Sequence, residues 1–145
     1  MKFFLVPSLL FMSFMVSAQN WVTNFEEAKT LAKNQDKTIL LVFSGSDWCA
    51  PCIKLDRNVW KTKEFQRFAE KHFVLYKADF PRKKKNKLPE QILSTNKTLA
   101  AQYNVKGYFP LVVLLNANGT VLAETGYRQE KAKVYISHLK TLLNK

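Results

Sequence analysis

Two cysteines, Cys49 and Cys52, are the reactive side chains on which the interpretation of this sequence depends. They are the only cysteines in the chain, and two residues separate them. An apolar, β-branched run (38–43) precedes them and a helix-compatible run (53–59) follows, so Cys49 is expected where a buried strand gives way to a helix. The unpaired amides and the dipole of a helix N-terminus stabilise a thiolate, which lowers a cysteine pKa from about 8.5 to roughly 3.5–7.5. Cys49 would then be nucleophilic near neutral pH, and Cys52, one helical turn later, would be placed to attack a mixed disulfide formed on Cys49.

Zinc binding, haem attachment and an inert disulfide are the other uses of such a pair. A structural zinc site needs four ligands, and the remaining candidates, His72 and His138, are expected at the ends of separate helices. Covalent haem attachment would require a histidine directly after Cys52, where Ile53 stands. A disulfide across two residues constrains almost no chain and therefore stabilises little. The sequence favours redox chemistry with no metal, and with no cofactor beyond the Cys49–Cys52 disulfide itself.

The first 18 residues have the pattern of a secretory signal peptide. Lys2 gives a positive start, residues 3–16 are largely apolar, and Val16-Ser17-Ala18 places small residues before a predicted cleavage after Ala18. The alternative is an uncleaved membrane anchor, but the apolar run is shorter than the roughly 20 residues of a spanning helix, and Pro7 interrupts it. The expected organisation is a signal peptide, 1–18, and one domain, 19–145. Export would place the cysteines in an oxidising compartment.

The chain is strongly basic, with 23 lysines and arginines against 11 acidic residues and a net charge of +12. Such a charge favours acidic partners or anionic surfaces. Its densest basic run, residues 82–87, lies between Pro81 and Pro89 without a periodic apolar face, so we expect an exposed loop. The loop is either merely solvated or a docking surface for an acidic protein partner or anionic lipid. Nucleic acid is not expected as a partner, because an exported chain without a recognised binding motif gives no reason for it.

The hydrophobic pattern predicts alternating helices and strands around one sheet. A helix between two apolar strands implies that those strands are parallel, and an Asn-Gly turn predicts a final antiparallel hairpin. The fold class is therefore α/β, a three-layer sandwich with a central mixed sheet. In chain order the expected elements are a helix from 25 to about 34, a strand at 38–44, a helix after Cys49 that continues to 71, a strand at 73–79, a short helix capped by Ser94 or Thr95, strands at 111–115 and 120–124, and a helix near 130–143.

These motifs together resemble thioredoxin. The resemblance rests on Trp48-Cys49-Ala50-Pro51-Cys52 after a hydrophobic strand, on Pro110 at the start of a late apolar strand, and on the Asn-Gly hairpin at 118–119. It covers roughly residues 24–143. More narrowly, the chain is similar to exported bacterial thioredoxin-like proteins of the thiol:disulfide interchange type, which implies a thioredoxin-like α/β/α sandwich and the bacterial periplasm as its compartment.

The resemblance also implies a role for each residue of the motif. Cys49 would be the attacking thiol and Cys52 the resolving thiol. Trp48 would flank the site as an apolar lid. Pro110 would be a cis proline facing the cysteines, and the backbone of Phe109 would pair with an extended substrate segment.

Three departures from the family pattern stand out. Thioredoxins usually carry a buried acid six residues before the first cysteine, where this chain has Phe43, so the proton acceptor for Cys52 is unassigned. Asp47 is the nearest acid in sequence, and we expect it to be exposed. Gly107 and Pro110 enclose two residues rather than one, with Leu111 in place of the usual threonine. The basic run 82–87 has no counterpart in minimal thioredoxins.

The resemblance implies an exported thiol-disulfide oxidoreductase that acts on protein thiols or disulfides. Pro51, beside Ala50 inside the motif, resembles reducing members of the family more than strong oxidants, so reductase or isomerase activity is expected. A reductase outside the cytoplasm would need electrons from a membrane-bound partner. The alternative function is a binding module without catalysis, in which the 82–87 loop docks an acidic partner. The sequence leaves the oligomeric state open.

Overall fold

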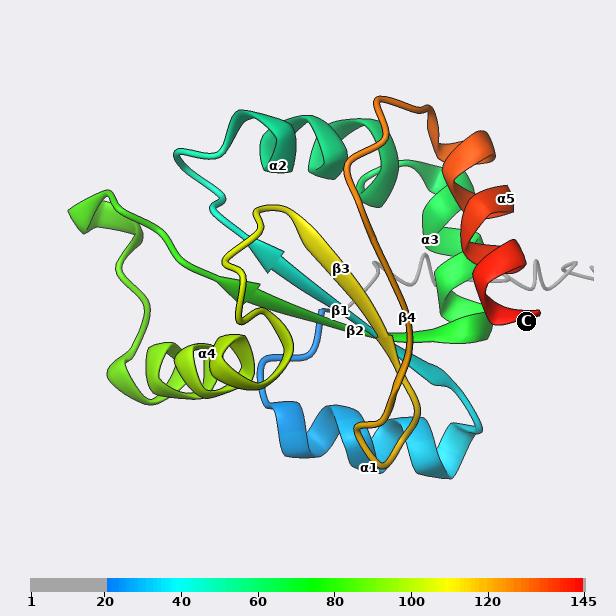
Figure 1. The fold of residues 1–145 in the computed structure, drawn as a ribbon, viewed down its shortest axis with the longest axis horizontal. Helices are drawn as coiled ribbons and strands as arrows, with labels where there is room; N and C mark the ends of the chain where they lie inside the picture. The colour runs from blue at the N-terminus through cyan, green and yellow to red at the C-terminus, as the bar shows by residue number, and fades with distance from the viewer. Residues whose placement is uncertain (1–20, 145) are drawn as a thin grey trace, which may run out of the picture.

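The computed structural model of the protein describes residues 21–144, so the expected signal peptide lies outside the described residues. A four-stranded sheet with strand order β2-β1-β3-β4 forms its centre. Figure 1 shows α1 and α4 on one face of this sheet and α2, α3 and α5 on the other. The elements are α1 (Phe25–Gln35), β1 (Thr38–Ser44), α2 (Ala50–Leu55), the π-helix η1 (Asp56–Trp60), α3 (Lys63–His72), β2 (Phe73–Asp79), the 3₁₀-helix η2 (Lys84–Asn86), α4 (Glu90–Tyr103), β3 (Leu111–Leu115), β4 (Val121–Gly126) and α5 (Ala132–Leu143).

The sheet is mixed, as the sequence predicts. β1 pairs with β2 in parallel, whereas β3 is antiparallel to both β1 and β4. The turn between β3 and β4 contains Gly119 at a φ of 83°, a left-handed conformation that glycine adopts without strain. The α/β sandwich with a mixed sheet is therefore confirmed.

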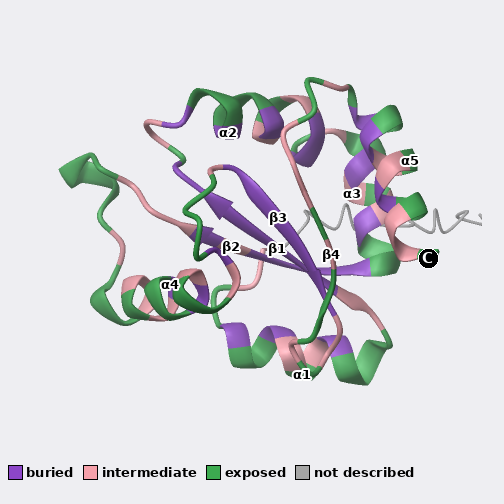
Figure 2. Cartoon of the chain, in the orientation of Figure 1, coloured by how far each residue is buried: buried purple, intermediate pink, exposed green. Residues whose placement is uncertain are grey.

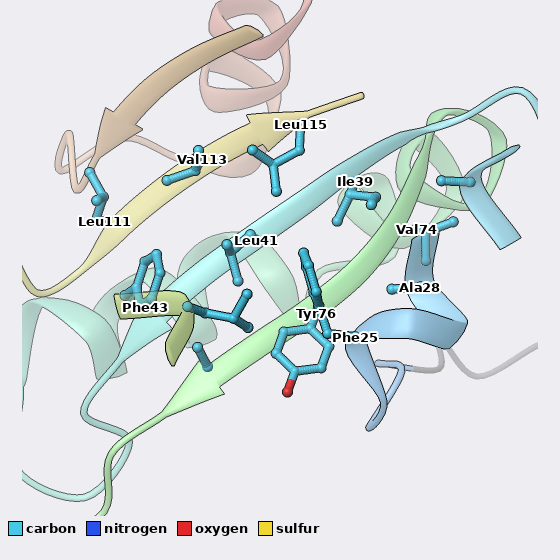
Figure 3. Close-up of a cluster of buried hydrophobic side chains, with 13 residues drawn as sticks. Phe25, Ala28, Ile39, Leu41, Phe43, Val74, Tyr76, Leu111, Val113 and Leu115 are labelled. Carbon is cyan, nitrogen blue, oxygen red and sulfur yellow. The ribbon is translucent and has the colours of Figure 1, made fainter. Parts of the chain in front are cut away.

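The absence of polar–apolar alternation in β1 follows from its place in the centre of the sheet. Ile39, Leu41 and Phe43 pack with α1 and β2 in one buried cluster, which Figure 3 shows in close-up. Leu40 and Val42 point to the other face and pack against the helices there. Both faces are covered, so successive side chains are buried, as the colouring in Figure 2 shows.

One predicted boundary is wrong. We expected Ser94 or Thr95 to cap a short helix, but α4 already begins at Glu90, directly after Pro89. Ser94 and Thr95 lie within the helix, where the Thr95 hydroxyl donates a hydrogen bond of 3.0 Å to the carbonyl of Gln91, one turn earlier. Such a bond to the preceding turn satisfies a hydroxyl inside a helix, so the residue type alone does not mark a helix start.

The basic run follows β2 as an exposed loop that includes η2, in agreement with the prediction. Parallel strands end at the same edge of a sheet, so this loop and the loop that carries the cysteines leave β2 and β1 at neighbouring points. In residues 21–144, no helix has the length and apolar character needed to cross a bilayer.

Candidate active site at the Cys49–Cys52 pair

Cys49 lies between β1 and α2, as its sequence context predicts. It is the N-cap residue of α2, and its sulfur accepts a hydrogen bond of 3.3 Å from the backbone N–H of Cys52. The two cysteines form a disulfide with their Cα atoms 5.2 Å apart. Both are nearly inaccessible, with 5% of Cys49 and 3% of Cys52 exposed. After reduction, the same N-cap position would present a helix amide to a thiolate on Cys49.

The two residues between the cysteines are compatible with the start of a helix. Ala50 and Pro51 are the first and second residues of α2. Amides in the first helical turn have no partner within the helix, so a proline there loses no hydrogen bond. α2 then continues without interruption into η1, where the backbone N–H of Asp56 donates to the carbonyl of Cys52.

Trp48 is fixed in place over the loop that leads to Cys49. Its indole N–H donates a hydrogen bond of 2.7 Å to the carbonyl of Phe80. Its ring packs against Phe109, with 5.5 Å between the ring centroids, and the guanidinium of Arg82 lies 3.8 Å from the indole centroid. Glycine is required at position 45, because a Cβ there would be 2.6 Å from the indole nitrogen. These contacts hold the half-buried side chain of Trp48 in the loop directly before Cys49.

The Phe109–Pro110 peptide bond is cis, as the resemblance implies. Pro110 is buried, and it lines the same cavity as Cys52. The segment before it is held by Asn104, whose side chain donates to the carbonyl of Tyr108 at 2.8 Å and accepts from the N–H of Tyr108 at 2.9 Å. Sequence reasoning did not identify Asn104, because an asparagine after a helix more often signals only a helix end.

Asp47, a residue of intermediate exposure, binds the basic loop through its carboxylate at the protein surface. It accepts hydrogen bonds from the backbone N–H groups of Arg82 at 2.9 Å and Lys83 at 3.0 Å, and from the side-chain amide of Asn86 at 2.9 Å. The bond from Arg82, followed by that from Asn86, lowers the pKa of Asp47 to about 2. The sequence pattern did not reveal these partners of Asp47, because they lie 35 or more residues away along the chain.

A second acid, Asp79 at the end of β2, holds the start of the cysteine loop. Its carboxylate accepts hydrogen bonds from the backbone N–H and the hydroxyl of Ser46. Its carbonyl accepts from the side chain of Asn96, 3.0 Å away, and Asn96 in turn accepts a bond of 2.9 Å from the hydroxyl of Tyr76. Asn96 is completely buried. This chain of contacts connects α4, β2 and the cysteine loop.

Cys52 lines a cavity with a volume of about 640 Å³, and the other residues of the lining are the neighbours that share this space with it. The side chain expected in the position of the usual acid, Phe43, packs into the core on the opposite face of the sheet. Val42 and Ser44 are the residues of β1 that line the cavity. Phe43 therefore presents no side chain to this cavity, because successive side chains of a strand point to opposite faces of the sheet.

No geometry suited to a metal ion is present in the part of the chain that the structure describes. Within residues 21–144 there is no group of three or more histidine, cysteine, aspartate or glutamate side chains able to hold one. His72 ends α3 as expected, but His138 lies within α5 and shares a hydrogen bond of 2.9 Å with Thr125.

Comparisons with known proteins agree with this geometry. A family model described as thioredoxin-like matches residues 20–117. The disulfide bond reductase DsbH of Chlamydia pneumoniae is 38% identical over 120 residues, which cover 83% of this chain and 70% of that protein. The thioredoxin-related protein DsbJ of the same organism is 27% identical over 96 residues, which cover 66% of this chain but only 27% of DsbJ. A solved structure titled DsbH oxidoreductase has a TM-score of 0.81 at 36% identity and covers 88% of this chain and 86% of that chain.

The family model spans more than half of the chain, and a relative above 30% identity covers most of it. Both matches include the strand, the cysteine pair and the helix that together build the site. The chain therefore belongs to the thioredoxin-like family.

Proposed function

We propose that this protein, a thiol-disulfide oxidoreductase, is exported and reduces disulfides in protein substrates through Cys49 and Cys52. The observation that carries the proposal is the position of Cys49 as N-cap of α2, directly after Trp48 and bonded to Cys52, with the cis Pro110 lining the same cavity as Cys52. The similarity to a protein named disulfide bond reductase supports the reducing direction. The apolar N-terminal pattern of residues 1–18 supports export.

The proposed reaction proceeds in two exchanges. The Cys49 thiolate attacks one sulfur of a substrate disulfide, the substrate S–S bond breaks, and the other substrate sulfur leaves as a thiolate. Cys52 then loses its proton and attacks Cys49, and the second substrate sulfur leaves as the Cys49–Cys52 disulfide forms. The substrate gains two electrons and the enzyme loses two. The enzyme must then be reduced again, and outside the cytoplasm we propose a membrane-bound dithiol protein as the donor.

Trp48, Phe109 and Pro110 are proposed to form the substrate-binding surface. The rings of Trp48 and Phe109 pack on each other, and Trp48 directly precedes Cys49 in the chain. Pro110 has no backbone N–H, so it donates no backbone hydrogen bond at this surface. An extended substrate segment could pair with the backbone of Phe109. Asp47, Ala50 and Pro51 are proposed to support the site by fixing the loop and the first turn of α2.

Insulin reduction in the presence of dithiothreitol tests the function. The wild-type protein should accelerate the precipitation of the insulin B chain, and the Cys49→Ser variant should match the buffer alone. In a separate incubation without dithiothreitol, the pre-reduced Cys52→Ser variant should accumulate a mixed disulfide with insulin, which added dithiothreitol then releases. Equal rates for wild type, Cys49→Ser and buffer would overturn the proposal.

The 82–87 loop is a second functional candidate, as a docking surface for acidic segments of substrates or partners. Two observations favour it: Asp47 fixes the loop beside the cysteine motif, and Arg82 lies against Trp48. Lys84, Lys85 and Lys87 are exposed, and within residues 21–144 they take part in none of the ion pairs.

Model disulfide peptides with acidic or neutral flanks can test this docking. Replacing Lys84, Lys85 and Lys87 by glutamine should slow the reduction of the acidic peptide several-fold and leave the neutral peptide unchanged. The preference of the wild type should also weaken as salt is raised, because exposed charges are screened. Capture of an acidic partner that needs the lysines but survives loss of both cysteines would instead favour a role in binding alone.

A further inference from the structure

The cavity beside Cys52 contains an ion pair to which neither the motif nor the resemblance gives a role. Asp56 and Lys77 both line this cavity, together with Cys52, and the Lys77 ammonium lies 2.9 Å from the Asp56 carboxylate. Asp56 follows Cys52 by four residues along the helix, and its backbone N–H donates to the carbonyl of Cys52. Side chains four residues apart on a helix lie on the same face, with their Cβ atoms about 5–6 Å apart. The pair is therefore close to the resolving sulfur.

Lys77 comes from the strand that neighbours β1. It is paired in register with Val42, the β1 residue whose side chain also lines the cavity. Its ammonium is held on one side by Asp56 and on the other by the ring of Trp21, 4.7 Å from the ring centroid. About a quarter of the Lys77 side chain is exposed. Water therefore screens its charge only partly, and its interaction with a nearby group is stronger than it would be in bulk water.

Two further cations face the cavity, and one of them also contacts Asp56. Lys61 lies 2.7 Å from the Asp56 carboxylate on a largely exposed side chain, and Arg57 lines the cavity from η1. β1 and α3 contribute Val42, Ser44 and Gln66, and the loops before α2 and β3 contribute Ser46 and Pro110; none of these is ionisable. Asp56 is therefore the one carboxylate among the described residues of this lining.

Asp56 carries its charge over the whole pH range in which cysteines titrate. Burial alone would raise the pKa of Asp56, but the hydrogen bonds from Lys61 and Lys77 outweigh it and hold the pKa below its ordinary value. A carboxylate whose pKa is lowered is a weaker base and a poorer acceptor for a thiol proton. Its effect on Cys52 is then electrostatic, and so is that of the lysine which neutralises it.

We propose that the Asp56–Lys77 pair sets how readily Cys52 gives up its proton in the resolving step, with Lys77 favouring the thiolate and Asp56 opposing it. The proposal rests on the exchange reaction proposed above and makes both residues positioning residues that act through Cys52. In this step the Cys52 thiol loses its proton to solvent, and the resulting thiolate forms a bond with the Cys49 sulfur. The bond between Cys49 and the substrate sulfur breaks, and that sulfur leaves with the electron pair. The pair thus supplies the electrostatic control that no acid on β1 provides.

The partial exposure of Lys77 and its pairing with Asp56 put the effect at the low end of what one nearby charge produces. An opposite charge within about 4–6 Å lowers a pKa by roughly 1–3 units, and for a partly solvated pair we expect about one unit. A shift of one unit changes the thiolate population about tenfold near pH 7. A more basic thiolate is also more nucleophilic, with a Brønsted slope of about 0.4–0.5, so the rate changes only about three- to fourfold.

The test follows the second thiol exchange directly. Reduced protein is mixed rapidly with dithiobis(nitrobenzoate), which labels Cys49, and attack by Cys52 then releases a second coloured thiolate in a phase independent of reagent concentration. The pH dependence of this phase reports the pKa of Cys52. We expect Lys77→Gln to raise this pKa by about one unit and to slow the phase about threefold at pH 7. We expect Asp56→Asn to lower it by about one unit and to speed the phase by a similar factor.

Controls separate the electrostatic effect from damage to the fold. Lys77→Arg keeps the charge and should restore the wild-type profile, whereas Lys133→Gln, on the exposed face of α5, should leave it unchanged. Shifts of the same sign in Lys77→Gln and Asp56→Asn, or no shift in either, would overturn the proposal. If Asp56→Asn does not fold, the comparison of Lys77→Gln with Lys77→Arg decides. Insulin reduction by the wild type is scored separately, so failure as a protein reductase would not be mistaken for failure of this inference.

Discussion

The buried contacts of Asn96 make the strongest prediction about what holds the site together. Asn96 accepts a hydrogen bond from the Tyr76 hydroxyl and donates one to the carbonyl of Asp79, whose carboxylate binds Ser46. Burial raises the pKa of Tyr76, so its hydroxyl stays protonated and requires an acceptor. Replacing Asn96 by alanine would take away the partner that it provides to the buried Tyr76 hydroxyl and to the partly buried Asp79 carbonyl. Each such group costs about 1–3 kcal/mol, and we expect Asn96→Ala to lower the free energy of unfolding by about 3 kcal/mol.

A loss of this size would be easy to measure. Small domains have a total stability of about 5–15 kcal/mol, and a urea m-value near 2 kcal/mol/M converts 3 kcal/mol into a fall of about 1.5 M in the unfolding midpoint. Tyr76→Phe removes only one of the two bonds and should cost about 1–2 kcal/mol. Far-UV circular dichroism of the oxidised proteins in urea measures both values.

The double variant tests whether the two residues act together. Because Tyr76→Phe also removes the hydroxyl that Asn96→Ala would leave unpaired, the combined cost should be smaller than the sum by about 1 kcal/mol. Additive losses in the free energy of unfolding, or an Asn96→Ala variant within about 0.5 kcal/mol of the wild type, would show that these hydrogen bonds do not stabilise the fold.

Three further predictions concern the loop and the first helix. Gly45→Ala should displace the Trp48 indole, because its Cβ has no room beside that ring; the indole N–H resonance of Trp48 should shift, and an unchanged resonance would contradict the packing. The pKa of Asp47 lies at about 2, below its ordinary 3.8, so the hold of Asp47 on the loop is complete above about pH 4 and is lost as the pH falls through about 2. The amide resonance of Arg82 should titrate with that midpoint and not at all in Asp47→Asn; a midpoint near 4 would refute it. Asn24→Ala removes the N-cap of α1 and should lower the free energy of unfolding by about 1 kcal/mol in urea; an unchanged midpoint would mean that solvent replaces the cap.

The local pattern of residues was sufficient to predict most of the fold and the position of the cysteine pair. The run of apolar residues in β1 predicted a strand covered on both faces, and the start of α2 at Ala50 followed from the change of periodicity after it. The cis Pro110 came from the family resemblance, because local periodicity carries no signal for the isomer of a peptide bond.

The errors arose where the outcome depends on contacts between distant segments. Ser94 and Thr95 have the residue types of helix caps, but α4 extends back to Glu90. His138 was expected at the end of a helix, but it lies within α5, where it shares a hydrogen bond with Thr125. In both cases the bounds of a helix decide the surroundings of a side chain, and short-range preferences do not fix those bounds.

By itself, the sequence determined the chemistry of this protein: two cysteines at the spacing of a redox pair, placed at a strand-to-helix junction by local hydrophobic patterns. Only the tertiary structure decided which charges surround that pair. Asp47 turns to the basic loop, Asp79 to Ser46, and Asp56 to Lys77 beside Cys52. The physical reason is that hydrophobic periodicity depends on neighbours along the chain, whereas the electrostatic environment of a thiol depends on side chains that the folded sheet brings together from distant parts of the sequence.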